Sequence, residues 1–408
     1  MKILMFTPYL PYPDSSGGQI RTQNLLKHLK QKHEITLFSL IKYQKEEQYV
    51  PILEKEFCKK VRVFYRPEKP WMFSNIMRTG FSTNPFLVVR NFSPEAKKAV
   101  EEELKTGHYD LIHAETFYAM PHIPKTNLPV VLVDQTIEYK VYDHYVKRTA
   151  PFLFRPLLAI DVAKLKFWER YYWRQADKVI AVSQKDKEEM LAVEPNIDVE
   201  IVPNGVNLDL FKKTQNWAKK PPVILISNNF KWLQNIEAAQ LLLDEIFPLV
   251  KKAVPYARVI VVGQHIPDSI KRYAGNDIEI RSLKEDDIAG TTKAYAEATV
   301  FASPVKGPGG TRLKNLAAMA SQLPMVTTSV GVAGLGAKPG RDILVGDDSE
   351  TFSRQLIKIM KSPKLGQELG ENSRKIVEES YDYEKIAEKL SQIYLSLSKK
   401  PVVSHVEP

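Results

Sequence analysis

The strongest chemical signal in this 408-residue sequence is a glycine-rich segment with two basic residues. It reads Gly307-Pro308-Gly309-Gly310-Thr311-Arg312-Leu313-Lys314. Glycines let a backbone approach a ligand closely, and the free N–H groups at a helix start attract anions. Arg312 and Lys314 add positive charge, while Thr311 can cap the helix or donate its hydroxyl. The segment therefore predicts a phosphate site, the alternative being an ordinary turn with solvated basic residues.

A second glycine pair, Gly17-Gly18, lies between the first apolar run and the first helical segment. In a doubly wound sheet this turn lies at the carboxyl edge, where ligands bind. Gly17 could approach a phosphate and Gly18 the transferred group, although a plain tight turn explains the pair equally well. Asp134 directly follows another apolar run and is a candidate contact for a sugar or an acceptor.

The sequence offers little for metal or thiol chemistry. Cys58 is the only cysteine, so it can form neither an intramolecular disulfide nor a zinc site built from thiols. A single cysteine agrees with a reducing, cytoplasmic compartment. No Asp-x-Asp pair occurs, which removes the usual short motif for a metal-bound nucleoside diphosphate. The formal net charge of +10 fits anionic partners such as nucleotides or phospholipids, or serves only solubility.

The elements that must position these residues alternate between apolar runs and helix-compatible segments. In the first half the expected buried strands are Lys2–Phe6, Glu34–Leu40, Leu111–His113, Val130–Val133, Val179–Val182 and Glu200–Val202. A helix-compatible stretch, Gln19–Lys30, separates the first two. Strand, helix and strand in this order predict a parallel α/β sheet.

After a polar, basic linker at 207–222 the same alternation begins again. The expected strands are Val223–Ile226, Arg258–Val262, Thr299–Ala302 and Met325–Thr327, and the expected helices are Asn235–Lys252, Thr291–Glu297 and Arg312–Ser321. The sequence therefore predicts two doubly wound, Rossmann-like α/β domains that face each other across a cleft. Their expected limits are 1–206 and 223–378, and 379–408 would hold a final amphipathic helix and a frayed tail.

Two stretches, Lys59–Arg90 and Tyr145–Trp173, mix basic residues with large apolar ones. Such a mixture suits the surface of an anionic membrane or a lipid-phosphate acceptor. For Leu165–Trp173 we prefer a packed helix, because its large residues recur at helical spacing. For Lys59–Arg90 a plain surface loop stays the alternative. No motif supports nucleic-acid binding.

Several motifs resemble those of the retaining glycosyltransferases of family four. In chain order they are Gly17-Gly18, Pro203-Asn204-Gly205-Val206-Asn207 with Phe211, Ile246-Phe247-Pro248, Val261-Val262-Gly263, Gly309–Lys314, Leu323-Pro324 and Thr328-Ser329-Val330-Gly331. The resemblance covers nearly the whole chain and implies a glycosyltransferase B-type fold. It implies that a nucleotide-sugar donor binds the second domain, that a glycan or lipid-linked acceptor binds the first, and that the last helix crosses back to the first.

The same resemblance implies that no metal or other cofactor is needed, since helix dipoles together with Arg312 and Lys314 would hold the diphosphate. The sequence nevertheless departs from the family pattern. The usual ribose-binding glutamate is Ala317, and a usual glycine is Gln322. The common basic pair of the first donor loop is also absent, although Lys231 lies nearby and could substitute. A lost hydrogen bond to a carboxylate, roughly 1.5–3 kcal/mol, weakens nucleotide binding about ten- to hundredfold.

We therefore expect an active hexosyltransferase that moves a sugar from a nucleoside diphosphate to an acceptor with retention, as in polysaccharide biosynthesis. The main alternative is a catalytically silent relative that acts as a binding or scaffold subunit. An epimerase of nucleotide sugars is a third alternative, which the match of Pro203–Phe211 disfavours.

Overall fold

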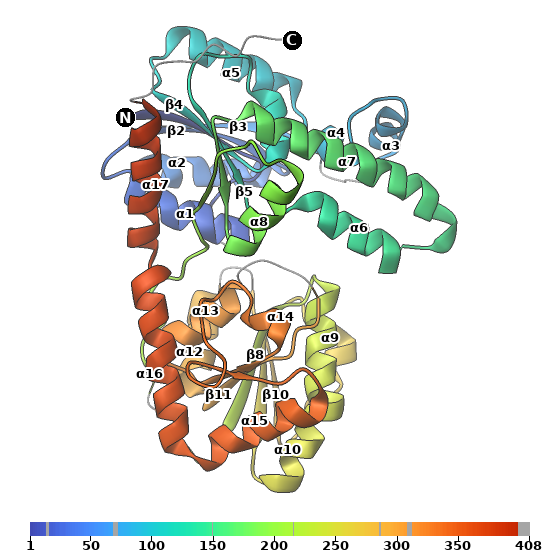
Figure 1. The fold of residues 1–408 in the computed structure, drawn as a ribbon, viewed down its shortest axis with the longest axis vertical. Coiled ribbons are helices and arrows are strands. Elements are labelled where there is room, and N and C mark those ends of the chain that lie inside the picture. Colours follow the sequence, from blue (N-terminus) through green and yellow to red (C-terminus); the bar gives the residue numbers. More distant parts are fainter. Residues whose placement is uncertain are drawn as a thin grey trace. The chain divides into compact units, whose positions relative to one another are not determined.

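The computed structural model describes residues 1–13, 16–67, 72–148, 150–214, 216–284, 287–307 and 312–398. The chain divides into two compact units (Figure 1). The first comprises Met1–Pro203 together with the segment from Ile386 onward, and the second comprises Asn204–Lys385. The expected frayed tail lies almost wholly outside the described residues, as do Gly309, Gly310 and Thr311.

A parallel sheet of seven strands forms the centre of the first unit, in the order β3-β2-β1-β4-β5-β6-β7. The strands are β1 (Lys2–Thr7), β2 (Glu34–Ile41), β3 (Lys60–Tyr65), β4 (Leu111–Glu115), β5 (Val130–Asp134), β6 (Lys178–Ala181) and β7 (Val199–Ile201). The central strands are buried on both faces, which is why they form continuous apolar runs in the sequence.

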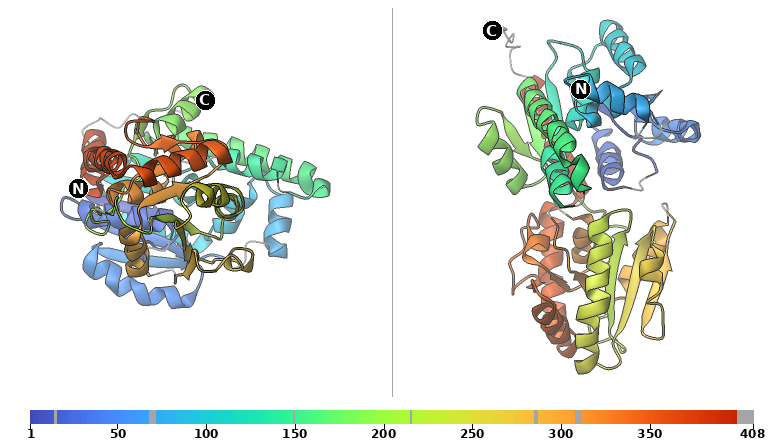
Figure 2. Two further views of the ribbon diagram at one scale, coloured as in Figure 1. Left: turned by 90° about the horizontal axis from the view of Figure 1, so that it is seen from below. Right: turned by 90° about the vertical axis from the view of Figure 1, so that its right-hand side faces the viewer.

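Helices connect the strands of the first unit. They are α1 (Gly17–Leu29), α2 (Val50–Glu56), α3 (Phe73–Gly80), α4 (Phe86–Asn91), α5 (Pro94–Thr106), α6 (Glu138–Arg148), α7 (Arg155–Gln175) and α8 (Gln184–Val193), with 3-10 turns η1 (Gln44–Tyr49), η2 (Phe117–His122) and η3 (Phe152–Phe154). The last helix, α17 (Tyr383–Ser398), belongs to this unit from Ile386 onward. Helices α6 and α7 form a long hairpin that extends away from the sheet (Figures 1 and 2). Within this unit, α17 packs through Ser391, whose hydroxyl lies 2.7 Å from Nε2 of His33.

The second unit contains a six-stranded parallel sheet in the order β10-β9-β8-β11-β12-β13. Its strands are β8 (Val223–Asn229), β9 (Arg258–Gln264), β10 (Ile278–Ser282), β11 (Val300–Ser303), β12 (Met325–Thr327) and β13 (Leu344–Val345). Its helices are α9 (Leu233–Leu241), the π-helical turn η4 (Leu242–Ile246), α10 (Phe247–Ala253), α11 (Asp268–Lys271), α12 (Ile288–Glu297), α13 (Leu313–Ala320), α14 (Ser329–Val332), α15 (Ser349–Lys361) and α16 (Pro363–Ser380). The predicted pair of Rossmann-like α/β domains is confirmed in these two sheets.

The sequence interpretation missed strands at the edges of the sheets. The stretch Lys59–Arg90 is not a loop, because it contains β3, α3 and α4. Strand β10 was missed in the same way. Both are edge strands with partly exposed side chains, so polar residues interrupt their apolar pattern.

Each sheet reverses its strand order beside its first strand. In the first unit β1 lies between β2 and β4, and in the second β8 lies between β9 and β11. Doubly wound sheets bind ligands outside the carboxyl ends of the strands at such points. The loops that follow these strands are therefore where functional side chains are expected. None of the helices that the structure describes is long and apolar enough to span a bilayer.

Candidate functional site

Two basic residues of the second unit lie beside the switch point between β8 and β11. Helix α13 begins at Leu313, directly after Arg312, and follows β11 in the chain. Lys314 is in the first turn of this helix, where unpaired N–H groups and the helix dipole favour an anion. The predicted order of strand, basic pair and helix is confirmed.

The ammonium group of Lys314 is surrounded by side-chain amides. Its Nζ donates to Oδ1 of Asn235 at 2.8 Å and also to Oδ1 of Asn228. Both asparagines are buried and flank the turn that joins β8 to α9. Burial, together with the nearby charge of Arg312, lowers the pKa of Lys314 to about 7. A bound anion would raise this pKa again, because it stabilises the charged form.

Three buried polar atoms at this edge have no hydrogen-bond partner among the residues that the structure describes. They are Oγ of Ser303 at the end of β11, Nε of Arg312 and Oδ1 of Asn315. Arg312 donates from Nη2 to the carbonyl oxygen of Gly307 at 2.7 Å, and burial lowers its pKa. Buried polar groups are normally paired, so three unpaired ones beside two cations indicate a polar, anionic ligand.

Lys231 lies on the exposed turn between β8 and α9. Its backbone N–H donates to Oδ1 of Asn229 at 3.1 Å, and the side-chain amide of Asn235 donates to the Asn229 carbonyl at 2.7 Å. Behind the turn, a Cβ on Gly263 would lie 1.8 Å from the carbonyl oxygen of Asn228. Only glycine fits there, and it lets β9 lie close to Asn228.

In the first unit the glycine pair begins α1 and lies against the half-buried Tyr9. Gly17 is the first residue of the helix, and a Cβ on Gly18 would lie 2.6 Å from the hydroxyl of Tyr9. This hydroxyl accepts a hydrogen bond from Nε2 of Gln135 at 2.9 Å. Burial raises the pKa of Tyr9 well above its usual value, so the phenol stays neutral. Glycine at position 18 thus allows the start of α1 to lie this close to Tyr9.

A buried carboxylate, Glu115 at the end of β4, is the centre of a polar network. It accepts hydrogen bonds from Nε2 of His113 at 2.7 Å and from the amide of Gln135. The guanidinium of Arg21 lies 4.0 Å away, and Nδ1 of His113 bonds to the hydroxyl of Tyr394 in α17 at 2.6 Å. Burial alone would raise the pKa of Glu115, but His113 and Arg21 lower it overall. We call these five residues and Tyr9 the Glu115 network.

Asp134 lies at the end of β5 and is only 1% exposed. Its Oδ2 accepts a hydrogen bond from the indole of Trp173 at 2.7 Å. Burial raises the pKa of Asp134 to about 7. The pKa of the nearby Glu169 is raised as well, first by burial and then by the negative charge of Asp134. Asp134 is therefore held by packed side chains, and its contact with a sugar stays a prediction.

Sequence reasoning missed several polar residues that the structure places beside the predicted ones. Asn228 and Asn235 surround Lys314, while Tyr9, Gln135 and Glu115 lie beside Gly18. The only sequence signal for Glu115 was its position near the end of an apolar run, two residues after a histidine. By resemblance, Asn228 stands where the family commonly has a basic residue of the first donor loop, whereas Asn235 gave no signal, because amides occur on most surface turns.

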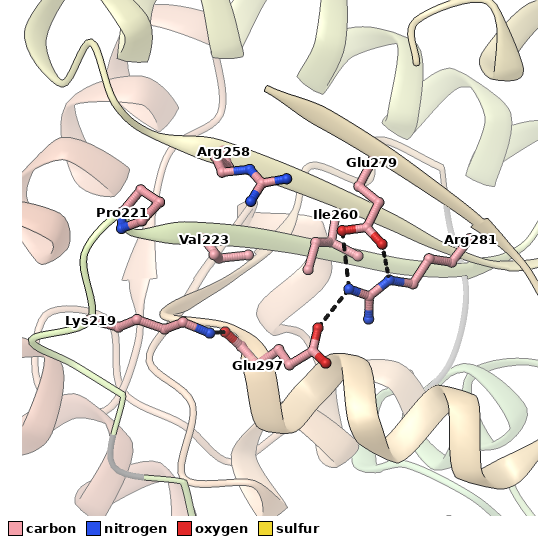
Figure 3. Close-up of a pocket in the computed structure, with 8 residues that line it drawn as sticks. All are labelled: Lys219, Pro221, Val223, Arg258, Ile260, Glu279, Arg281 and Glu297. Atoms are coloured by element: carbon pink, nitrogen blue, oxygen red, sulfur yellow. Dashed lines mark hydrogen bonds and ion pairs between the residues drawn. The ribbon is translucent and has the colours of Figure 1, made fainter. Parts of the chain in front are cut away.

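A small pocket of about 150 Å³ lies at the opposite edge of the second sheet, near the amino ends of β8 and β9 (Figure 3). Arg281 spans it and pairs with Glu279 and Glu297, each at 2.6 Å. These charges are already paired, which is typical of a structural ion-pair network. The described residues include no group of three or more histidine, cysteine or acidic side chains that could hold a metal ion.

Comparison with known proteins agrees with this geometry. Residues 15–210 match the family described as Glycosyltransferase Family 4, and residues 221–362 match Glycosyl transferases group 1. An uncharacterised 44.6 kDa protein of the cps region from Klebsiella pneumoniae is 23% identical over 404 residues, which cover 94% of this chain and 97% of that protein. Alpha-monoglucosyldiacylglycerol synthase from Acholeplasma laidlawii is 22% identical over 315 residues, covering 71% of this chain and 76% of that protein.

Two solved structures have the same fold over nearly the whole chain. Sucrose-phosphate synthase from Thermosynechococcus elongatus has a TM-score of 0.68 at 17% identity, covering 97% of this chain and 99% of its own. HepE from Anabaena, solved in complex with UDP, has a TM-score of 0.63 at 16% identity, covering 97% of this chain and 100% of its own. Two family matches in order, on two Rossmann-like domains, leave one conclusion: the chain belongs to the family 4, group 1 glycosyltransferases.

Proposed function

We propose that this glycosyltransferase moves a sugar from a nucleoside diphosphate to a hydroxyl of a glycan or lipid-linked acceptor, with retention of configuration. The single observation that carries the proposal is the set of unpaired buried polar atoms beside Arg312 and Lys314. Two cations and orphaned polar groups at one sheet edge suit a diphosphate with its attached ribose or sugar.

In this proposal Arg312 and Lys314 hold the diphosphate, and Lys231 supplies a third positive charge from the neighbouring turn. Gly309, Gly310 and Thr311 lie outside the described residues, and their sequence favours N–H donation to the phosphates. No metal is needed, because fixed cations stabilise the negative charge that develops on the leaving diphosphate. The partly neutral Lys314 regains its proton when the diphosphate binds.

The chemical step breaks the bond between C1 of the sugar and the phosphate oxygen, and it forms a bond from C1 to the acceptor oxygen. The proton of the acceptor hydroxyl passes to the leaving phosphate on the same face of the sugar. Retention of configuration follows, because attack and departure share that face. The positive charges of Arg312 and Lys314 lower the energy of the departing diphosphate in this step.

On the acceptor side, the turn at Gly17-Gly18 lines the reacting groups, and Tyr9 with Gln135 supplies hydrogen-bonding groups beside it. Glu115 orients Gln135 and acts through it as a positioning residue. Asp134 is proposed to support a sugar or acceptor contact through the same edge of the sheet. The relative from Acholeplasma laidlawii is named for a glucosyl diacylglycerol product, which supports a lipid-linked acceptor as the first to test.

Product analysis tests the proposal. The protein is incubated with UDP-glucose and a diacylglycerol acceptor, since HepE was solved with UDP, and the glycoside is examined by NMR. The proposal predicts a new glycoside with the anomeric configuration of the donor. An inverted product would contradict retention, and an isomerised free donor would indicate an epimerase. GDP and ADP sugars, with glycan acceptors, extend the same assay.

A further inference from the structure

Large apolar side chains of the first unit are exposed on α3 and around the tip of the α6–α7 hairpin. On α3 and the residue that follows it, Phe73 is 76% and Phe81 is 85% exposed. At the tip of the α6–α7 hairpin and in the first turn of α7, Phe152, Leu153 and Leu157 are 79%, 85% and 63% exposed. Side chains of this size normally lie in a core, and a concentration of them marks an interaction surface.

Hydrogen bonds hold the end of α3 and the loop after it against α7, the helix that carries Leu157 and Ile160. Nζ of Lys164 on α7 donates to the carbonyl oxygens of Thr79 and Ser82 at 2.7 Å each. The indole of Trp168, one turn further along α7, donates to the carbonyl of Thr83 at 2.8 Å. We call Phe73, Phe81, Phe152, Leu153, Leu157 and Ile160 the apolar face.

The hairpin that carries much of this face is held in place. Glu169 on α7 accepts the backbone N–H groups of Glu138 and Tyr139 at 2.8 and 3.0 Å, and so caps the start of α6. At the tip, Nε of Arg155 donates to the carbonyl of Ala150 at 3.0 Å. The base of the hairpin is therefore anchored to the end of α7, and Arg155 bridges to Ala150 at its tip.

Helix α7 is apolar on two sides. Leu165 and Trp173 face the core and are buried, whereas Leu157 and Ile160 lie on the solvent side, as does Leu153 in the preceding turn η3. A surface helix normally has one apolar stripe and a polar opposite face. The second stripe on α7 has no partner in the described chain. Its burial against an apolar partner would be favourable, because it would remove these side chains from water.

The charge around the apolar face identifies its occupant. Segments 72–91 and 143–168 together carry seven lysine and arginine residues and two acidic residues. Of these, Asp143 pairs with Lys147 at 2.7 Å, and Oδ1 of Asp161 accepts the backbone N–H of Phe86 at 2.8 Å. A second copy of this chain would bring two basic faces together, which costs binding energy. An anionic lipid surface instead satisfies both the apolar side chains and the surrounding cations.

We propose that the apolar face docks on an anionic lipid bilayer, with the hairpin tip and α3 entering the interfacial layer. In this arrangement Arg78 and Lys147 supply the electrostatic attraction to the headgroups. The proposal goes beyond sugar transfer and does not rest on the donor site, because no residue of the apolar face belongs to the second unit.

Flotation of the full chain with vesicles tests this proposal. The vesicles contain phosphatidylcholine alone or an equal mixture of phosphatidylcholine and phosphatidylglycerol, at low and at high salt. We expect binding to the anionic vesicles that weakens at high salt. Leu153→Ser combined with Leu157→Ser, and separately Phe73→Ser combined with Phe81→Ser, should each lower vesicle affinity about tenfold or more.

Tyr256→Ser is the matched control, because Tyr256 is 55% exposed but lies in the second unit. It should bind vesicles as the wild type does. Nucleotide binding and circular dichroism of every variant should stay unchanged, which separates loss of docking from loss of the donor site or the fold. Equal floatation of the serine variants and the wild type would overturn the proposal. So would absence of vesicle binding together with a dimer that the same serine variants dissociate.

Discussion

The Nζ of Lys314 lies 2.8 Å from the side-chain oxygen of Asn235, so a cation expected to meet a phosphate is held by neutral amides. Amide oxygens orient an ammonium group without cancelling its charge. Burial, helped by the charge of Arg312, lowers the pKa of this group to about 7. Lys314 is thus positioned to bind an anion, and its protonation state becomes coupled to the binding of that anion.

Nucleotide binding should depend on pH through Lys314. Below pH 7 the ammonium is already charged in the unliganded protein, so its protonation adds little pH dependence. Above pH 7 the unliganded protein loses the proton first, and binding must restore it, so Kd should rise by up to about tenfold per pH unit. Calorimetric titration at pH 8 in buffers of different ionisation enthalpy should reveal proton uptake.

Lys314→Met is the variant that checks this coupling. It should bind the nucleotide more weakly and with a flatter pH profile above pH 7. An unchanged slope in that variant would assign the pH dependence to another group. Asn228→Asp adds a carboxylate beside Lys314, so it should move the fall in affinity to higher pH.

Gly18→Ala should impair transfer without impairing nucleotide binding. The added methyl would lie 2.6 Å from the Tyr9 hydroxyl, which Gln135 holds in place. Displacing this pair disturbs the acceptor side, and we expect kcat/KM for the acceptor to fall about tenfold or more. Gly80→Ala is the control, because its Cβ would meet nothing within 4 Å. Equal kinetics for the two variants would remove Gly18 from the acceptor side.

Gln322 stands where the family usually has glycine, and its backbone geometry favours glycine. Its φ is +57°, in the left-handed region that favours glycine, and a Cβ on Gly370 would lie 2.3 Å from its carbonyl oxygen. Gln322→Gly should therefore stabilise the second unit by about 1 kcal/mol, while Gln322→Ala should not. Denaturant unfolding of both variants measures this difference. Equal stability of the two variants would show that the left-handed backbone costs little here.

The first unit should become less stable as the pH rises from about 4 to about 7, because of Asp134. Burial raises the pKa of this carboxyl from 3.8 to about 7, so in that range the folded state holds a proton that the unfolded state has lost. Asp134→Asn still accepts a hydrogen bond from Trp173. The difference in melting temperature between this variant and the wild type should grow in favour of the variant as pH rises from 5 to 8. A constant difference would contradict the raised pKa.

The parts of this structure that the sequence predicted are those set by local pattern. Central strands such as β1 and β5 are buried on both faces and read as apolar runs, whereas the edge strand β3 does not. Arg312 and Lys314 were found because they are two positions apart at a helix start that follows a glycine-rich segment. Glu115 and Gln135 are twenty positions apart and meet only through sheet pairing of β4 and β5, which no local spacing reveals.

The most direct test of the account is calorimetric titration of the protein with UDP, GDP and ADP, repeated on the double variant Arg312→Ala with Lys314→Ala. Each lost charge-assisted contact should cost roughly 1.5–3 kcal/mol, so binding should weaken at least a hundredfold. The account predicts binding of one nucleotide by the wild type and its loss in the double variant. Absence of binding to all three, or binding that the double variant retains, would contradict the donor site and favour a silent binding subunit.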